Sequence, residues 1–505
     1  MIFKTYNSHK VAQAFFNGYF FANLFLGFTA LYGFVSGAGI FATLYGLLYI
    51  ITVALLSLNK TFRSSPFAIP FCFFTFLFFN IPAAFILIEG GDYIYGTGLA
   101  STPFLQSAYQ QALPWGFLFL SFCCFAVWWG IVTANSKRRK INEESFSSIK
   151  LAPVLLTGAV VLVIAWFGNQ RFAVAQMSGA EYSDSLLSLI FFDNAYLAMA
   201  GLLLAFKLNE QKDTANLQKI NLLIFLIFIG FVAVQFMAGS KAAIMTRFVL
   251  LVLYPLSFFR EYPDARISFP SPKFLVIMAL ISLPMFLIAL IQRDPSVSFA
   301  AMSEFNVGVA YDVFSQIFYR FSHGGIDRFL LIFQSFIINT PDTGITIDFI
   351  NYLAKNTLNL LLPGTPFPEA YAPSSQLFPQ VIEYNLLGGD IGRKELIMSL
   401  NTQPYTMFGV FMIIFGLAAP LFLYLFTFGF IFIYGKFKNV FLKITMIIFF
   451  AGALSSYGIE TTIGDSVHIF ASVLLLYFLI RILSMFKVIL PDKMDYIPES
   501  ISVGK

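Results

Sequence analysis

Long apolar stretches separated by short polar connections recur along this chain. A helix of roughly 17 to 25 apolar residues crosses the hydrocarbon core of a bilayer, which is about 30 Å thick. Lipid cannot satisfy a polar backbone, so each stretch is expected to be helical. The pattern therefore predicts an all-α polytopic membrane protein with about 12 transmembrane helices. The predicted spans are Val11–Leu31, Gly39–Leu56, Phe67–Ile88, Pro114–Ala134, Leu151–Phe167, Leu186–Phe206, Ile220–Met237, Ala242–Phe259, Phe274–Ile291, Met407–Ile433, Phe441–Tyr457 and Val467–Phe486.

One connection, 292–404, is much longer than the others. It is too long for a simple connecting loop and too apolar for a disordered segment. From Val309 to Phe321 apolar residues recur at helical spacing, which predicts an amphipathic helix lying on the membrane surface or over the bundle. After Gly324-Gly325 a second apolar helix is expected, from about Arg328 to Ile338. The chain thus divides into helices 1–9 (1–291), the large loop (292–404), helices 10–12 (405–487) and a tail (488–505).

Lysine and arginine are concentrated in alternate connections. With the N-terminus in the cytoplasm, the inside connections hold these basic residues and the outside ones are poor in them. The positive-inside rule then predicts an even number of helices, both termini in the cytoplasm, and the segment 292–404 outside. The inside residues are Lys60, Arg63, Lys137, Arg138, Arg139, Lys140, Lys207, Lys212, Lys219, Arg260, Arg266, Lys273, Lys436, Lys438 and Lys443.

Composition agrees with this class of protein. Hydrophobic residues make up 58% of the chain and charged residues 11%, and the mean hydropathy is +0.79. Soluble proteins are about a quarter charged, so a surface facing water on all sides is excluded. Cys72, Cys123 and Cys124 fall inside apolar stretches, and the three histidines lack zinc-type spacing. Neither a disulfide framework, a metal site nor a cofactor is expected, and no nucleic-acid partner.

Basic residues on the outer face are informative because the positive-inside rule disfavours them there. Gly239-Ser240-Lys241 precedes the eighth predicted span, whose N-terminus faces outward. Free N–H groups at a helix start favour an anion, Ser240 can donate, and Lys241 adds a full charge. Arg247 lies about 9 Å deeper on a regular helix, and Arg171 is a further outer cation. The alternative is a tight turn whose lysine extends to the lipid headgroups.

A second candidate site lies in the large loop. Arg320 and His323 share a helix face, and the glycines that follow allow Asp327 and Arg328 to turn back toward them. A guanidinium can hold a diphosphate through paired hydrogen bonds, and an imidazole can move a proton near neutral pH. Alternatively, these residues tie two surface helices together.

A third candidate, Gly388–Glu395, lies just before the chain re-enters the membrane. Its glycines allow the backbone to approach a ligand, and Arg393 and Lys394 supply cations. Phosphate-loop and dinucleotide-binding patterns are absent from the sequence. In the sixth predicted span, Asp193 is an intramembrane acid that is either functional or bonded to a neighbouring helix.

Together with the topology, three short motifs resemble the Wzy-type O-antigen polymerases, also called oligosaccharide repeat unit polymerases. Met237–Lys241 stands where those proteins often show a Gly-Ser-Arg start to a helix. Leu362-Pro363 resembles their loop prolines, and Gln403–Phe411 resembles the segment that returns the chain to the membrane. Lysine at position 241 departs from the family's arginine, which bears on bidentate phosphate binding there.

The resemblance implies a GT-C-like membrane glycosyltransferase in a bacterial inner membrane, with no cofactor. It would transfer a growing glycan from undecaprenyl diphosphate to a new undecaprenyl-diphosphate-linked repeat unit at the periplasmic face, with a chain-length regulator protein as a further partner. His323 would accept the proton of the attacking hydroxyl, with Asp327 or Glu395 as alternatives. Cations would stabilise the leaving diphosphate, whose charge grows as the glycosidic bond breaks. The diphosphate-binding residues would be Arg171, Ser240, Lys241, Arg247, Arg320, Arg328 and Arg393.

Two other functions fit parts of the pattern. An O-antigen ligase has a similar topology and an outer loop with arginine and histidine, but it transfers the finished glycan to lipid A–core. A lipid-linked oligosaccharide flippase or transporter would also have about a dozen helices. Such a protein seldom needs a large outer loop, and its inner cavity needs more charge within the membrane than Asp193 and Arg247 supply.

Overall fold

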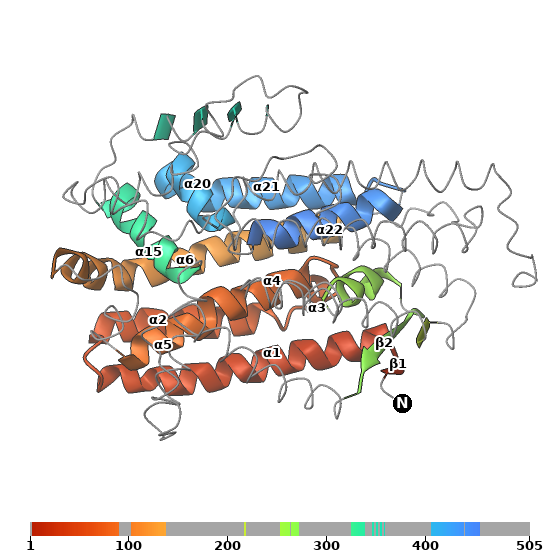
Figure 1. Ribbon diagram of the computed structural model, residues 1–505, viewed down its shortest axis with the longest axis horizontal. Coiled ribbons are helices and arrows are strands. Elements are labelled where there is room, and N and C mark those ends of the chain that lie inside the picture. The colour runs from red at the N-terminus through yellow and green to blue at the C-terminus, as the bar shows by residue number, and fades with distance from the viewer. Residues whose placement is uncertain are drawn as a thin grey trace, which may run out of the picture.

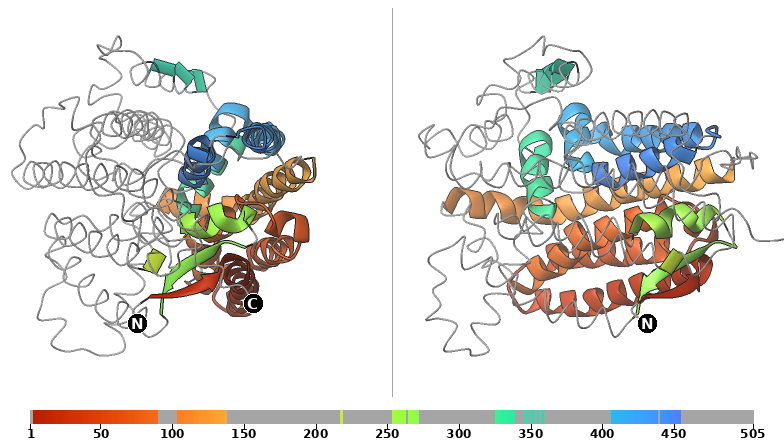
Figure 2. Two further views of the ribbon diagram at one scale, coloured as in Figure 1. Left: turned by 90° about the vertical axis from the view of Figure 1, so that its right-hand side faces the viewer. Right: turned by 45° about the vertical axis from the view of Figure 1, so that its right-hand side comes forward.

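The computed structural model describes residues 3–89, 103–137, 217–218, 253–262, 264–271, 325–338, 346–347, 350–351, 354–355, 358, 406–438 and 440–454. These residues form a bundle of long helices that run nearly side by side, with a small two-stranded sheet at one end (Figure 1). Two further views show the same bundle from its end and obliquely (Figure 2).

The first long helix, α1 (Ser8–Ala30), is extended by the short turn η1 (Leu31–Phe34). Asn7 starts it, because its side-chain oxygen accepts hydrogen bonds from the backbone N–H groups of His9 and Lys10 at 3.0 and 3.3 Å. This cap satisfies two donors that the helix itself cannot pair. The predicted span at this position is confirmed and begins slightly earlier than expected.

The turn from α1 into α2 (Ile40–Leu56) depends on glycine. Gly37 and Gly39 have φ angles of 84° and 91°, which glycine adopts without the steric cost of a Cβ atom. The chain can therefore reverse within a few residues, and α2 packs back along α1 (Figure 1).

After the short helix α3 (Lys60–Arg63), the next span is formed by α4 (Ala68–Thr75), η2 (Phe76–Asn80) and α5 (Ile81–Glu89). The sequence predicts an uninterrupted helix here, but η2 is one turn of π-helix. Pro82 explains the difference. A proline lacks the N–H that would bond the carbonyl four residues earlier, and its ring crowds that carbonyl, so the helix widens locally.

The longest helix among the described residues, α6 (Pro103–Ser136), packs along α21 (Ala419–Tyr434) and along α2. Gly130 allows the close approach of α6 and α21. A Cβ atom added at Gly130 would lie 2.9 Å from Cβ of Thr427 and 3.1 Å from the backbone nitrogen of Phe428. Small residues of this kind let helix backbones meet closely within a membrane.

The predicted span 407–433 is divided into α20 (Met407–Phe415), the short turn η8 (Gly416–Ala418) and α21. Gly416 causes the break, because its φ of 53° lies outside the right-handed helical region. The chain then reverses, and α22 (Val440–Leu454) packs against α4 and α21.

The prediction of a purely helical chain is wrong at the N-terminus. The strand β1 (Phe3–Asn7) pairs antiparallel with β2 (Arg266–Pro270), so that Phe3 lies opposite Pro270 and Asn7 opposite Arg266. The short turn η5 (Phe259–Glu261) precedes β2. Alternation over five residues is too short a signal to distinguish a strand from a polar extension of the neighbouring span.

Part of the large loop packs against the bundle. The predicted helix from about Arg328 to Ile338 is confirmed as α15 (Ile326–Phe333) followed by the π-helical turn η6 (Gln334–Ile338). It lies against α6 and α20. A second contact between the loop and α20 is made by Thr346, whose hydroxyl donates to the carbonyl of Ile413 at 3.4 Å.

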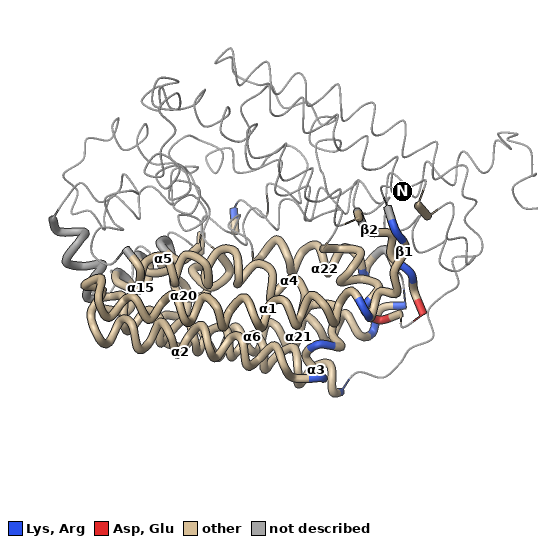
Figure 3. Tube along the Cα trace, turned by 90° about the horizontal axis from the view of Figure 1, so that it is seen from below, with Lys and Arg blue, Asp and Glu red and all other residues tan. Residues whose placement is uncertain are grey.

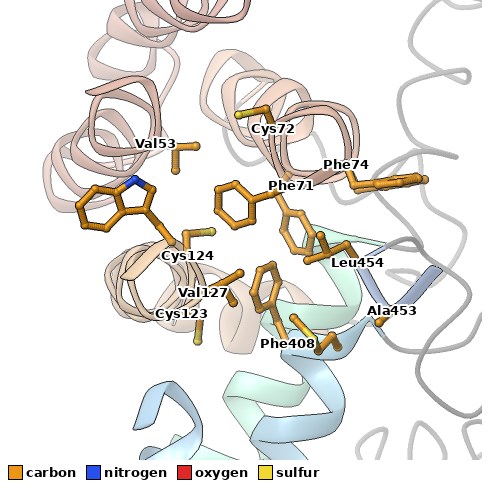
Figure 4. Packing of buried hydrophobic residues seen from close by; sticks show 14 of the residues in the cluster. Val53, Phe71, Cys72, Phe74, Cys123, Cys124, Val127, Phe408, Ala453 and Leu454 are labelled. Atoms are coloured by element: carbon orange, nitrogen blue, oxygen red, sulfur yellow. The ribbon is translucent and has the colours of Figure 1, made fainter. Parts of the chain in front are cut away.

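The interior of the bundle is filled largely by aromatic rings. Phe67 makes edge-to-face contacts with Phe430, Tyr434 and Phe450, with ring centroids 6.0, 4.8 and 5.1 Å apart. In Figure 4 side chains from α2, α4, α6 and α20 meet in one layer, and Phe408 points toward Phe71.

The outward faces of the helices are apolar as well. On α1, Phe21, Phe25 and Phe28 are 66%, 67% and 72% exposed. Helices that are apolar on all sides are buried in a large protein or in a bilayer. Four segments of the described chain are long and apolar enough to cross a membrane, and two shorter apolar helices accompany them. The four are Ser8–Phe34, Ala68–Ile88, Ala112–Ser136 and Met407–Tyr434.

The described part of the chain is thus mostly helical and fits a helical membrane protein. Several predicted spans lie outside the described residues: Leu151–Phe167, Leu186–Phe206, Ile220–Met237, most of Ala242–Phe259, Phe274–Ile291 and Val467–Phe486.

Candidate functional site

Charge is strongly polarised along the bundle, as Figure 3 shows. We call the end that carries β1, α3, η5 and the C-terminus of α21 the basic end. Its described cations are Lys4, Lys10, Lys60, Arg63, Lys137, Arg260, Arg266, Lys436, Lys438 and Lys443. The described carboxylates there are only Glu261 and Asp264. All the predicted inside residues that the structure describes therefore gather at a single end.

Two arginines at the basic end are partly buried and join separate elements. Nε of Arg260 donates to the carbonyl of Arg63 at 2.5 Å, and Nη1 of Arg260 donates to Nδ1 of His9. Nε of Arg63 donates to the carbonyl of Ser57 at 2.6 Å. Burial lowers the pKa of Arg260, and the positive charge of Arg63 lowers it further. These bonds tie η5 to α1 and α3, which is a structural role.

The remaining buried cation at this end has a partner. Nζ of Lys443 lies 3.5 Å from Oε2 of Glu261, and both side chains are almost fully shielded from solvent. Lys443 also lies over the ring of Tyr434, 5.7 Å from its centroid. A buried charge without such partners would be costly, so this pair connects α22 to η5.

A closed polar network lies deep inside the bundle. Asn80 is its centre: its Oδ1 accepts from the hydroxyl of Tyr49 at 2.6 Å, and its Nδ2 donates to Oδ1 of Asn23 at 2.6 Å. The Nδ2 group also reaches the hydroxyl of Tyr19 at 3.4 Å. That hydroxyl lies 3.3 Å from Oγ1 of Thr75, which donates to a backbone carbonyl. All five side chains are buried, so the network joins α1, α2, α4 and η2 in an apolar setting.

The pattern of apolar stretches does not reveal this network. The one hint in the sequence is the presence of polar side chains inside apolar spans. An amide in a membrane helix needs a hydrogen-bond partner, which another helix usually supplies. Which of them meet depends on how the helices pack, and the sequence pattern does not give that.

The helix α15 lies on the bundle through a continuous apolar stripe. Ile326, Phe329, Leu330 and Phe333 are all buried and recur at the spacing of one helix face. The ring of Phe329 packs against Phe79 and Phe119, with centroids 6.4 Å apart in each case. These contacts place α15 in the half of the bundle away from the basic end (Figures 1 and 3).

The start of α15 lies close against the backbone of Phe78. A Cβ atom added to Gly325 would lie 2.1 Å from the carbonyl oxygen of Phe78 and 2.9 Å from its carbonyl carbon. Phe78 belongs to η2, the π-helical turn that precedes Pro82. Glycine therefore allows the loop to enter the bundle at this depth, a packing role in addition to the turn predicted at the glycine pair.

The turn η6 carries a buried amide. Gln334 is 9% exposed, and its side-chain oxygen has no hydrogen-bond partner among the described residues. Most buried polar atoms in proteins have a partner, and π-helical turns are frequent at functional sites. The amide oxygen of Gln334 could accept a hydrogen bond from a ligand hydroxyl or amide.

Two of the predicted site residues, Asp327 and Arg328, lie within the described chain. They occupy the first turn of α15, between the buried residues Ile326 and Phe329. The structure thus places this part of the second candidate site against the bundle. The other predicted residues lie outside the described residues: Arg171, Ser240, Lys241, Arg247, Arg320, His323, Arg393 and Glu395.

The described residues contain no group of three or more histidine, cysteine, aspartate or glutamate side chains arranged to hold a metal ion. Cys72, Cys123 and Cys124 are free and buried. Comparisons of the chain with protein-family models, with curated proteins and with solved structures gave no match. The resemblance to O-antigen polymerases therefore rests on the three short motifs and the topology.

Proposed function

We propose that this chain is a membrane-embedded glycosyltransferase that polymerises lipid-linked oligosaccharide, as the Wzy-type O-antigen polymerases do. The observation that carries the proposal is the position of α15 and η6. This part of the 292–404 segment packs on the bundle in the half away from the basic end. A loop built into the membrane-embedded body can hold a substrate whose lipid anchor stays in the bilayer.

The charge distribution supports the orientation that this function needs. With the basic end in the cytoplasm, as the positive-inside rule predicts, α15 lies toward the periplasm. Asp327 and Arg328 then lie on the periplasmic side with the first turn of α15. The buried amide oxygen of Gln334, which has no partner among the described residues, offers an acceptor for a sugar hydroxyl or amide.

In the proposed reaction, a hydroxyl oxygen of the incoming repeat unit attacks the anomeric carbon of the growing glycan. The new glycosidic bond forms as the bond to undecaprenyl diphosphate breaks, and the diphosphate keeps the electron pair. The hydroxyl proton passes to His323, with Asp327 or Glu395 as alternatives. Arg171, Ser240, Lys241, Arg247, Arg320, Arg328 and Arg393 are the residues proposed to bind the diphosphate. Their fixed charges stabilise the transition state more than the ground state.

The banding of lipopolysaccharide in a deletion strain tests the proposal. Loss of a polymerase leaves single repeat units on the core, whereas loss of a ligase leaves none. Unchanged long chains would contradict both transfer functions. The remaining alternative would be a transporter of a different substrate.

Substitutions then test the residues. Lys241→Ala and Arg320→Ala should abolish long chains while the protein remains in the membrane at its normal amount. The matched control is Lys10→Ala, which removes an exposed lysine at the basic end and should leave chain length unchanged. Normal chain length in both test variants would refute the assigned diphosphate site.

A further inference from the structure

Three exposed lysines lie at the ends of α6 and of two elements that contact it, α3 and α21. Lys60 begins α3, Lys137 follows α6, and Lys436 follows α21. The elements are in contact, since Nδ2 of Asn135 on α6 donates to the carbonyl of Thr61 on α3 at 2.9 Å. We call these three residues the lysine cluster.

Aromatic rings on α21 lie beneath two members of the cluster. Nζ of Lys137 lies 5.4 Å from the ring centroid of Phe428, and Nζ of Lys436 lies 4.4 Å from that of Phe432. The two rings stack on each other with centroids 6.0 Å apart. Such cation–π contacts hold an ammonium group near a ring without neutralising its charge, so both groups keep N–H donors for an anion.

The lysine cluster lacks carboxylate partners in the described structure. The ion pair there joins Lys443 to Glu261, and neither residue belongs to the cluster. Ten described cations face two described carboxylates at the basic end, an excess of eight positive charges (10 − 2). Within the described structure the basic end therefore carries a large net positive charge, which favours an anionic ligand.

The face of α6 that leads to the cluster is apolar and exposed. Phe122, Phe125 and Trp129 are 55%, 45% and 44% exposed, and the rings of Phe125 and Trp129 stack at 6.1 Å. An apolar face that ends in a tryptophan and then in cations matches a phospholipid, with its acyl chains along the helix and its headgroup at the lysines.

We propose that the lysine cluster, with Phe428 and Phe432 beneath it, binds the headgroup of an anionic phospholipid in the leaflet at the basic end. The site is separate from Arg328, the described member of the proposed diphosphate site, which belongs to α15 in the other half of the bundle. It does not depend on the proposed function.

Tryptophan quenching tests this proposal on the full chain. The variant Trp115→Phe/Trp166→Phe leaves Trp128 and Trp129, the two tryptophans near the cluster, as reporters. It is reconstituted in phosphatidylcholine vesicles that contain either brominated phosphatidylglycerol or brominated phosphatidylcholine. We expect the anionic lipid to bind roughly fivefold more tightly than the zwitterionic one, the effect of about one lysine near an anionic surface.

Matched variants locate the site. Lys137→Gln/Lys436→Gln should lower the preference severalfold, and Lys137→Arg/Lys436→Arg should retain it. The control Lys4→Gln/Lys10→Gln removes the same charge from β1 and α1 and should keep the wild-type preference. Equal quenching by both lipids in the unsubstituted reporter overturns the proposal. An equal loss of preference in the control and test variants also overturns the proposal. The preference would then come from the positive charge of the whole basic end and not from the lysine cluster.

Discussion

At the scale of single residues, Asn80 is the centre of the polar network inside the bundle. It bonds Tyr49, Asn23 and Tyr19 at once, so three helical segments meet at one amide. In an apolar setting every member of such a network needs its partners, because no water is present there to form a hydrogen bond with an unpaired polar group.

Asn80→Leu should lower the free energy of unfolding by about 1–2 kcal/mol, since it leaves the hydroxyl of Tyr49 and the amide of Asn23 without their partner. The measurement is thermal unfolding of purified protein followed with a thiol-reactive dye, which suits this chain because its three cysteines are free and buried. Asn17→Leu makes the same change at an exposed position of α1 and should cost little. Equal losses in the two variants would contradict a role for the network.

Gly416 shows how one backbone angle determines the course of a helix. Its φ of 53° separates α20 from α21, where the sequence predicts a single span. Nothing lies within 4 Å of a Cβ atom built at Gly416, so the requirement for glycine comes from the backbone conformation and not from crowding.

Gly416→Ala should therefore destabilise the protein by about 1–2 kcal/mol, the cost of a positive φ for an L-residue. Gly429→Ala is the matched control, because Gly429 lies within α21 and its added Cβ also meets nothing within 4 Å. Alanine there should be neutral or slightly stabilising, since it favours the helix. Both are compared by thermal unfolding, and a similar melting temperature for the two would argue against backbone strain.

At the scale of elements, the π-helical turn η2 and the helix α15 belong together. Pro82 disturbs the helix at Phe78, and the loop enters the bundle with Gly325 against that carbonyl. The irregular stretch of α4–η2–α5 is thus one of the places where the 292–404 segment meets the bundle, in addition to α6 and α20.

Gly325→Ala should loosen α15, because its Cβ would overlap backbone atoms of Phe78 that cannot move aside. We expect a loss of about 1–3 kcal/mol and new trypsin cleavage in α15 after Arg328. Gly116→Ala is the comparison: its Cβ would meet Cδ2 of Leu330, the end of a flexible side chain, so the cost should be smaller. If trypsin cleaves after Arg328 no faster in Gly325→Ala than in the unsubstituted protein, the packing argument is contradicted.

At the scale of the whole molecule, the basic end and α15 lie in opposite halves of the bundle (Figure 3). This polarity links the orientation of the chain to its proposed chemistry, because the positive-inside rule predicts that the basic end lies in the cytoplasm and that α15 therefore lies toward the other face.

A membrane-impermeant maleimide tests the orientation. Val35→Cys, in the exposed turn after η1, should be labelled in intact spheroplasts, whereas Lys438→Cys should be labelled only after permeabilisation. The native cysteines are buried and serve as an unlabelled background. The reverse pattern would place α15 in the cytoplasmic half and would remove the basis of the proposed glycan transfer.

The apolar runs of the sequence located most of the helices now described, because burial in lipid demands a long uninterrupted stretch. Alternating positive charge predicted which connections share an end, and the described ones do. Both signals are local in sequence. For the candidate site, the local pattern predicted the helix that carries Asp327 and Arg328. It did not predict how deeply that helix packs into the bundle.

Tertiary structure alone decided how these pieces meet. The pairing of β1 with β2, the contact of Gly325 with Phe78 and the meeting of Asn80 with Tyr49 and Asn23 each join residues far apart in the chain. Such contacts depend on which helix faces pack together, and hydrophobic periodicity identifies a buried face without naming its neighbour.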